Sequence, residues 1–394
     1  MTEEKLSLRL RMKKQLKRFD WLIFLPYLAL SLLGVVMVYS ASAYRLMMQQ
    51  GSMISAGVKQ FAFLIVSLIC IALIYFMKAK FLQNKTLIFS GYLLSLLLLF
   101  AVKIFGKTIN GAKGWLSLFG VQFQPLELFK LAMIFMMAYL LTRGEHWDFA
   151  RKFLVYISIG LGLMLILAQP DTGGFIICAL LLMAIWLCSG TPVLHTLSII
   201  GLLFIFGLMV IGILLLLDTS GYRSQRFLSA WNPFSDTQGS GHQIVNSYYA
   251  LNNGGWFGVG LGKSIEKLGF LPEAQTDFIF SIIVEELGMI TGILVVCAMA
   301  IIILRTFYIG YTAKNRFNKI LCIGIGTLIF LQMFINLGGL LSIIPLTGVT
   351  LPFLSQGGTS LVILSLGIGV VLKISAIEYN YRRRQPKRKL KVIE

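Results

Sequence analysis

The residues with the greatest potential for chemistry lie in a short polar stretch that leads directly into an apolar run. The stretch KLGFLPEAQTDFIFSIIVEELG, residues 267–288, places Asp277 at the entrance to this run and Glu285 and Glu286 inside it. Carboxylates at membrane depth are costly, so each of the three is a candidate functional residue. An aspartate at a helix start can also serve as an N-cap or as a first-turn acid. The spacing alone leaves both roles open for Asp277.

Other polar residues occur in the segments between apolar runs. A helix beginning at Pro125 would place Glu127 and Lys130 on one face at an i,i+3 spacing, either as a substrate site or as an ion pair satisfied within the first turn. Asp171 lies in the QPDTGG turn, where a turn role and a catalytic role both fit. Trp115 is either an interfacial anchor or a ligand contact. The remaining candidate cations belong to a site or to a solvated surface: Lys113, Arg223, Lys263 and Lys267.

The composition is that of an integral membrane protein. Of the 394 residues 57% are hydrophobic and 13% are charged, and the mean hydropathy is +0.82. Runs of roughly 20 apolar residues recur along the whole chain. We therefore predict an all-α polytopic membrane protein with ten spans, at residues 20–42, 60–77, 86–105, 127–142, 153–168, 175–190, 195–217, 277–304, 320–341 and 357–377.

The net charge of +19 is explained by membrane topology. Most Lys and Arg residues fall in the basic tails 1–19 and 378–394 and in short loops on one side, which predicts that both termini are cytoplasmic. A single broken helix around QPDTGG would place two basic clusters outside, so two spans are predicted there. The C-terminal basic run predicts anchoring at an anionic inner leaflet, and no nucleic-acid partner is expected.

The same topology places the longer polar segments of the single membrane domain, residues 20–377, outside the cell. These segments are the loops 106–126, 218–276 and 342–356. Because ATP is scarce there, a bond-forming enzyme would need a substrate that arrives already activated, such as a lipid-linked pyrophosphate sugar. A carboxylate could take the proton from the attacking hydroxyl, and cations or a divalent metal could stabilise the departing pyrophosphate.

Five motifs of the chain resemble the SEDS family of shape, elongation, division and sporulation proteins. They are QPLELFK, QPDTGG, NPFSDTQGSGHQIVNSYYAL, GWFGVGLGKSIEKLGFLPEAQTDFIFSIIVEELG and PLTGVTLPFLSQGGTS. The resemblance extends over essentially all ten spans and is closer to division-type (FtsW-type) members than to elongation-type (RodA-type) members. The chain departs from the family pattern at Gln275, Leu126, Gln356 and Gly114, where the family usually has His, Ser, Tyr and Arg.

The resemblance implies a peptidoglycan glycosyltransferase that polymerises lipid II at the outer face of a bacterial plasma membrane, during division and at the septum. It implies as partners the growing glycan chain, a class B penicillin-binding protein that cross-links the strands, and other division or elongation proteins. A divalent cation, Mg or Mn, is left open as a cofactor. The alternatives are an elongation-type polymerase, a transporter of the lipid-linked precursor and a non-enzymatic scaffold of the division machinery.

The resemblance also assigns roles to residues of this chain. Asp277 matches the family's essential aspartate and is the expected general base. The expected substrate-binding residues are Lys130, Glu127, Lys113, Trp115, Arg223, Lys263 and Lys267. The expected supporting residues are Asp171, Glu285, Glu286 and Gln275.

Overall fold

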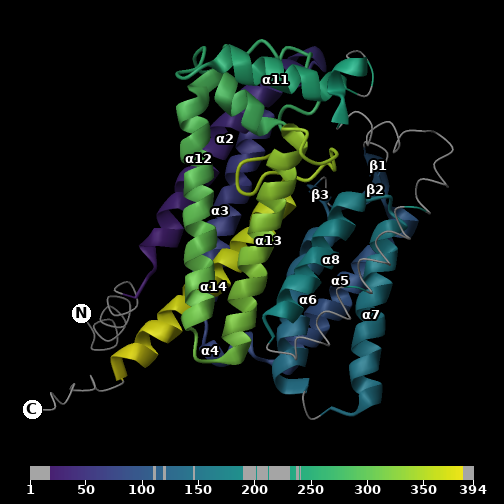
Figure 1. Ribbon diagram of the computed structural model, residues 1–394, viewed down its shortest axis with the longest axis vertical. Helices are drawn as coiled ribbons and strands as arrows, with labels where there is room; N and C mark the ends of the chain where they lie inside the picture. The colour runs from purple at the N-terminus through teal and green to yellow at the C-terminus, as the bar shows by residue number, and fades with distance from the viewer. Residues whose placement is uncertain are drawn as a thin grey trace, which may run out of the picture.

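The computed structural model shows a mostly helical chain, as predicted (Figure 1). It describes residues 18–109, 112–118, 121–144, 147–189, 231–236 and 241–384, with isolated positions at 201, 212 and 239. Arg223 and, apart from two isolated positions, the predicted span 195–217 lie outside the described residues.

Eight helices in the described part of the chain are long and apolar enough to cross a membrane. They are α2 (Trp21–Met48), α3 (Ser55–Phe76), α5 (Lys85–Phe105), α6 (Pro125–Arg143), α7 (Phe149–Leu167), α12 (Ile279–Thr312), α13 (Arg316–Leu340) and α14 (Gly358–Arg384). A shorter apolar helix, α8 (Thr172–Leu187), coincides with the predicted span 175–190. The protein is thus a multi-pass membrane protein, and the total of ten spans stays a prediction.

The helices form two groups that lie side by side (Figure 1). One group contains α2, α3, α12, α13 and α14, and the other contains α5 to α8. Helix α13 packs against α6 and α8, and α14 packs against α6, so these contacts join the groups. The joining helices α6, α13 and α14 are largely buried, whereas α3, α5 and α7 expose most of their apolar side chains, as lipid-facing helices do.

Several of the longer connecting segments lie at one end of the bundle, which we call the loop end. Helix α11 (His242–Gly254), the β-strands and the connection between α13 and α14 lie there (Figure 1). The start of α2, the short helix α4 (Ala79–Leu82) and the end of α14 lie at the opposite end. The location of the loop end outside the cell stays a prediction.

Residues 106–126, expected to be a loop, contain a small antiparallel sheet. Strands β1 (Lys107–Ile109), β2 (Ala112–Leu118) and β3 (Val121–Phe123) pair in the order β1-β2-β3. Ile109 pairs with Ala112, and the intervening sequence Asn-Gly is the dipeptide most typical of a two-residue hairpin. The segment between the two spans therefore contains a hairpin that its sequence signals locally.

Helix α12 is not the uninterrupted span predicted at 277–304. Gly288 has φ +85° and ψ 165°, which breaks the helix between residues 279–287 and 289–312. The loop after α11 runs along this break: the amide of Val259 donates to the carbonyl of Glu285 (2.9 Å), and the amide of Met289 donates to the carbonyl of Gly255 (2.9 Å). A Cβ at position 288 would lie 2.3 Å from the Trp256 carbonyl oxygen, so only glycine fits.

Candidate functional site

Asp277 lies just before α12, in the turn that leads from the loop end into the bundle. The helix N-cap is Phe278, and the first turn of α12 contains no acidic residue, so Asp277 adopts neither of the capping roles that the sequence left open. On α13, the side-chain amide of Asn336 donates to the backbone carbonyls of Asp277 (2.9 Å) and Val349 (2.7 Å). A Cβ on Gly348 would lie 3.6 Å from Oδ2 of Asp277, which places the carboxylate against residues 347–349.

Glu127 and Lys130 form the ion pair that their spacing allowed. The ammonium nitrogen of Lys130 lies 2.7 Å from Oε1 of Glu127, and both side chains are buried. Pro125 is the first residue of α6, as predicted. Gln332 of α13 donates to the other carboxylate oxygen of Glu127 at 3.4 Å. A buried pair of this kind is strongly destabilised when one partner is removed, because the other charge is left uncompensated.

Asp171 caps helix α8 at the same end of the bundle. Its Oδ1 accepts a hydrogen bond from the amide of Gly174 at 2.7 Å, and its Oδ2 accepts one from the Gln124 side chain at 3.5 Å. Burial raises the pKa of the Asp171 carboxyl above its ordinary value, and the nearby Lys130 ammonium opposes this rise. The structure therefore brings Asp171 into the electrostatic environment of Lys130 while giving it a structural role.

The Glu127–Lys130 pair and Asp277 are both contacted by side chains of α13. Gln332 and Asn336 are one turn apart on α13, and they contact Glu127 and the backbone of Asp277 respectively. The start of α8 packs against the loop that faces Asp277, since a Cβ on Gly173 would lie 2.9 Å from the Thr347 side chain. Asp277 and Asn336 thus face the 347–349 loop directly. The Lys130–Glu127 pair is linked to the same region through Gln332 of α13.

Glu285, Glu286 and Lys267 form a second buried polar group. Oε1 of Glu285 accepts from the amide of Ile265 at 3.0 Å, and its Oε2 accepts from the Ser264 hydroxyl. Lys267 donates to Glu286 at 2.6 Å. The glutamates therefore hold the loop that leads to Asp277. Their supporting role in the reaction and the substrate-binding role of Lys267 both stay predictions.

The other expected site residues are engaged elsewhere or lie at the surface. Lys113 donates to the carbonyls of Lys103 (2.9 Å) and Ile104 (3.3 Å) at the end of α5, and Trp115 lies opposite Lys107 in the sheet. Lys263 is exposed. Gln275 is buried, and its backbone carbonyl accepts from the amide of Gln356 at 2.9 Å.

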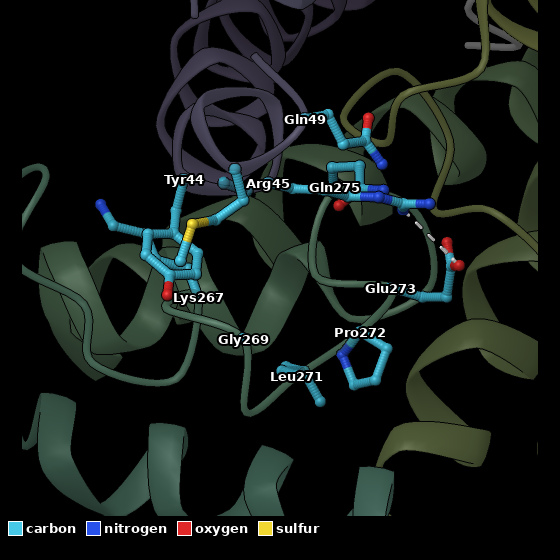
Figure 2. A pocket seen from close by; sticks show the side chains of 11 residues that line it. Tyr44, Arg45, Gln49, Lys267, Gly269, Leu271, Pro272, Glu273 and Gln275 are labelled. Atoms are coloured by element: carbon cyan, nitrogen blue, oxygen red, sulfur yellow. Dashed lines mark ion pairs between the residues drawn. The ribbon is translucent and has the colours of Figure 1, made fainter. Parts of the chain in front are cut away.

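Several polar partners in these groups were missed by sequence reasoning. Gln332 and Asn336 carried a usable signal, because two amides at an i,i+4 spacing within an apolar span are costly unless they have partners. Ser40 of α2, whose hydroxyl donates to Glu286, and Ser264 carried none, since a serine in a membrane helix or loop is unremarkable in sequence. Sequence reasoning also missed a cavity of about 350 Å³ beside Arg45 and Glu273, which Figure 2 shows.

The described residues do not form a metal site whose ligands all come from protein side chains. Nowhere in the described part of the chain do three His, Cys, Asp or Glu side chains converge as metal ligands. Magnesium can also be held by one or two carboxylates together with substrate phosphates, so a substrate-borne cation is compatible with this site.

The many apolar helices define a membrane-embedded protein. Buried acids and cations lie toward the loop end of its bundle. Residues 20–380 match the family model described as "Cell cycle protein", which covers FtsW, RodA and SpoVE. The chain therefore belongs to the FtsW/RodA/SpoVE family, which confirms the predicted family.

Curated relatives match almost the full length of the chain. A protein of Enterococcus hirae named "Probable peptidoglycan glycosyltransferase FtsW" is 40% identical, over 94% of this chain and 96% of its own. "Stage V sporulation protein E" of Bacillus subtilis (strain 168) is 34% identical, over 90% and 96%.

Solved structures share the fold. A chain from a peptidoglycan synthase complex that coordinates polymerization and crosslinking superposes with a TM-score of 0.72 at 27% identity, covering 92% of this chain and 98% of that one. The rod shape determining protein RodA of Thermus thermophilus superposes with a TM-score of 0.63 at 25% identity, with the same coverage.

Proposed function

We propose that this protein is a peptidoglycan glycosyltransferase that polymerises lipid II into glycan strands at the outer face of the plasma membrane during cell division. The observation that carries the proposal is the position of Asp277, whose carboxylate faces the 347–349 loop, while Asn336 of α13 binds its backbone one turn from Gln332, a partner of the buried Lys130–Glu127 pair. Family membership and relatives named as peptidoglycan glycosyltransferases support it. Relatives named FtsW support the division role and hence a location at the septum.

In the proposed reaction Asp277 is the general base. It takes the proton from a sugar hydroxyl of one substrate, and the resulting oxygen nucleophile attacks the anomeric carbon of the other. The bond from that carbon to the undecaprenyl pyrophosphate breaks, the pyrophosphate leaves with the electron pair, and the configuration inverts. The partial exposure of Asp277 gives a substrate hydroxyl access to its carboxylate.

The departing pyrophosphate needs positive potential nearby. Lys130 is the proposed source of this potential, and because its ammonium is paired with Glu127 at 2.7 Å, the pyrophosphate would have to replace this carboxylate as its partner. Lys113, Lys263 and Arg223 remain proposed contacts of the pyrophosphate, and Trp115 and Lys267 remain proposed contacts of the substrate. No step of the reaction is assigned to a metal.

The proposed partner is a class B penicillin-binding protein that cross-links the new strands. A similar solved chain comes from a complex that coordinates polymerization and crosslinking, which supports a partnership of this kind. Other division proteins belong to the same proposal. A glycan strand made in the membrane by one protein would pass directly to a transpeptidase beside it.

The decisive experiment is strand formation from purified lipid II in liposomes that carry the substrate on the accessible face, with and without the partner transpeptidase. We expect polymer from the wild type and at least a hundredfold less from Asp277→Asn, in line with the loss of a general base. Asp148→Asn is the matched control, because this acid is exposed and pairs only with Arg151 among the described residues.

The possible results of this assay distinguish the enzyme from the scaffold and from the transporter. Polymer from Asp277→Asn at the wild-type rate would refute the base assignment. No polymer from folded wild-type protein with an active partner would favour the scaffold, and appearance of lipid II on the opposite leaflet in the same assay would favour the transporter.

A further inference from the structure

A cavity of about 350 Å³ opens between the loop end of α2 and residues 267–275 (Figure 2). Its polar lining comes from Tyr44 and Arg45 on α2, from Gln49 just after that helix, and from Lys267, Glu273 and Gln275 on the facing segment. Figure 2 shows the Arg45 side chain extending toward Glu273. The cavity therefore borders the segment that ends at Asp277, although none of the roles proposed above uses Arg45 or Glu273.

The Arg45 guanidinium is only loosely satisfied. Its closest acidic partner is Glu273, at 3.7 Å, and its side chain is 49% exposed. Within the described residues its guanidinium group donates no hydrogen bond. A guanidinium has five N–H donors in a planar fork, so most of this binding capacity is unused by the described residues at a position that lines the cavity.

The chemistry that fits such a fork is an oxyanion. Guanidinium groups bind carboxylates and phosphates through two parallel hydrogen bonds, with a geometry that a lysine cannot reproduce. Glu273 already places one carboxylate near this position, at a distance longer than a good hydrogen bond. Glu273 thus occupies the position that an anionic ligand would take, but it binds Arg45 less tightly than a ligand with two hydrogen bonds would.

Glu273 is also tied to the turn that holds the proposed base. Its side chain accepts a hydrogen bond from the Thr276 hydroxyl at 3.0 Å, and its backbone carbonyl accepts from the amides of Thr276 (3.2 Å) and Phe278 (3.3 Å). Asp277 lies between these two residues. An anion that replaces Glu273 as the partner of Arg45 would therefore change the contacts of the turn that contains Asp277.

We propose that this cavity is an oxyanion subsite for the substrate, in which Arg45 binds the anion and Glu273 is the internal group that the anion displaces. The inference rests on the proposed function and deepens it. Lipid II offers oxyanions of two kinds, the pyrophosphate of its lipid carrier and the carboxylates of its stem peptide, and either would fit the fork.

The test is steady-state polymerisation of lipid II by the full-length protein with its partner. For Arg45→Gln we expect KM to rise about tenfold with kcat within a factor of two, and for Arg45→Lys a smaller rise, because a point charge replaces the fork. For Glu273→Gln we expect KM to fall, since the internal competitor loses its charge. Arg151→Gln, an exposed cation at the opposite end of the bundle, is the matched control.

The opposite directions of the two KM shifts distinguish a ligand site from a structural ion pair. A pair that only stabilised the fold would make both variants worse in the same sense. An unchanged KM in Arg45→Gln, or a raised KM in both variants, overturns the proposal. If the wild type makes no polymer, the proposed function fails, whereas wild-type polymer with an unaltered Arg45→Gln variant refutes the subsite alone.

Two further arms identify the source of the anion. If the pyrophosphate binds here, undecaprenyl pyrophosphate added alone will inhibit the wild type about tenfold more strongly than Arg45→Gln. If the stem peptide binds here, lipid II with amidated carboxylates will show a raised KM with the wild type, and Arg45→Gln will raise it no further. A negative result in both arms overturns the proposal.

Discussion

The ammonium nitrogen of Lys267 lies 2.6 Å from Oε1 of Glu286, with both side chains almost completely buried. Ser40 of α2 completes the contact: its hydroxyl accepts from Lys267 at 2.9 Å and donates to Glu286 at 2.7 Å. Three segments distant in sequence meet in this group, namely α2, the loop before Asp277 and the segment before the break at Gly288. The group therefore fixes the path by which the chain reaches the proposed base.

Removing the Lys267 charge should destabilise the protein severely. In Lys267→Met the Glu286 carboxylate remains buried without its cation, and we expect the free energy of unfolding to fall by about 3–5 kcal/mol. Denaturant unfolding in detergent, followed by tryptophan fluorescence, measures this loss.

A control and a double variant test the cause. Lys263→Met removes an exposed cation four residues earlier and should change stability by less than about 0.5 kcal/mol. Lys267→Met combined with Glu286→Gln should recover part of the loss, because no unpaired charge remains. Equal effects of the two lysine variants would show that the ion pair is not what holds the loop.

The glycine at the break in α12 should be irreplaceable. Gly288→Ala places a Cβ 2.3 Å from the Trp256 carbonyl oxygen at φ +85°, so the loop and the helix break cannot both persist. We expect a loss of about 3 kcal/mol or more, or a failure to accumulate folded protein, read by size-exclusion chromatography in detergent.

The matched control is Gly91→Ala, in the interior of α5, where an added Cβ would meet nothing within 4 Å. Helix propensity alone should make that variant neutral or more stable by up to about 1 kcal/mol. Similar behaviour of the two variants would contradict the geometry at Gly288.

The sequence was sufficient wherever structure depends on neighbouring residues. The spans follow from runs of apolar residues, and the Glu127–Lys130 pair follows from its i,i+3 spacing on a helix that starts at Pro125. The hairpin of β1 and β2 was also readable, from Asn-Gly between two short strands.

The sequence was insufficient wherever distant segments meet. A glycine within an apolar run is a weak helix breaker, so hydropathy could not locate the break at Gly288, which depends on backbone contacts with residues 255–260. The partner of Lys267 could not be found either, because Glu286 reaches it only through the same loop. The arrangement of site residues is a tertiary property, and family resemblance rather than local pattern identified Asp277.

Asn336 should be important for turnover because it holds Asp277 and the facing loop together. Its amide donates to the backbone carbonyls of Asp277 and Val349, so Asn336→Leu removes both bonds without adding a charge. We expect kcat for lipid II polymerisation to fall about tenfold or more, because a misplaced base costs more in rate than in binding, with a stability loss of about 1–3 kcal/mol.

The control for Asn336 is Asn315→Leu, which removes the N-cap of α13 at the opposite end of the bundle. It should cost about 1 kcal/mol of stability and leave the catalytic constants unchanged. If both variants lose activity in proportion to stability, Asn336 has only a structural role.

Glu266 supplies a titratable group in the loop before Asp277. Its side chain is 7% exposed, and its Oε2 has no hydrogen-bond partner among the described residues. Burial and, secondarily, the charge of Glu285 raise the pKa of the Glu266 carboxyl from 4.5 to about 7. The folded protein therefore holds this proton over a pH range in which the unfolded chain has released it.

Stability should consequently fall as pH rises through this range. Between pH 4.5 and about 7 the folded state binds more protons than the unfolded state, so the free energy of unfolding decreases as pH rises through this range. Glu266→Gln, which is neutral at every pH, should abolish this part of the dependence and be more stable than the wild type at pH 8. Asp148→Asn, which alters an exposed carboxyl, should retain the wild-type profile. Unfolding curves measured from pH 5 to pH 8 test this, and parallel profiles for wild type and Glu266→Gln would mean that the carboxyl is already ionised in the folded protein at pH 5.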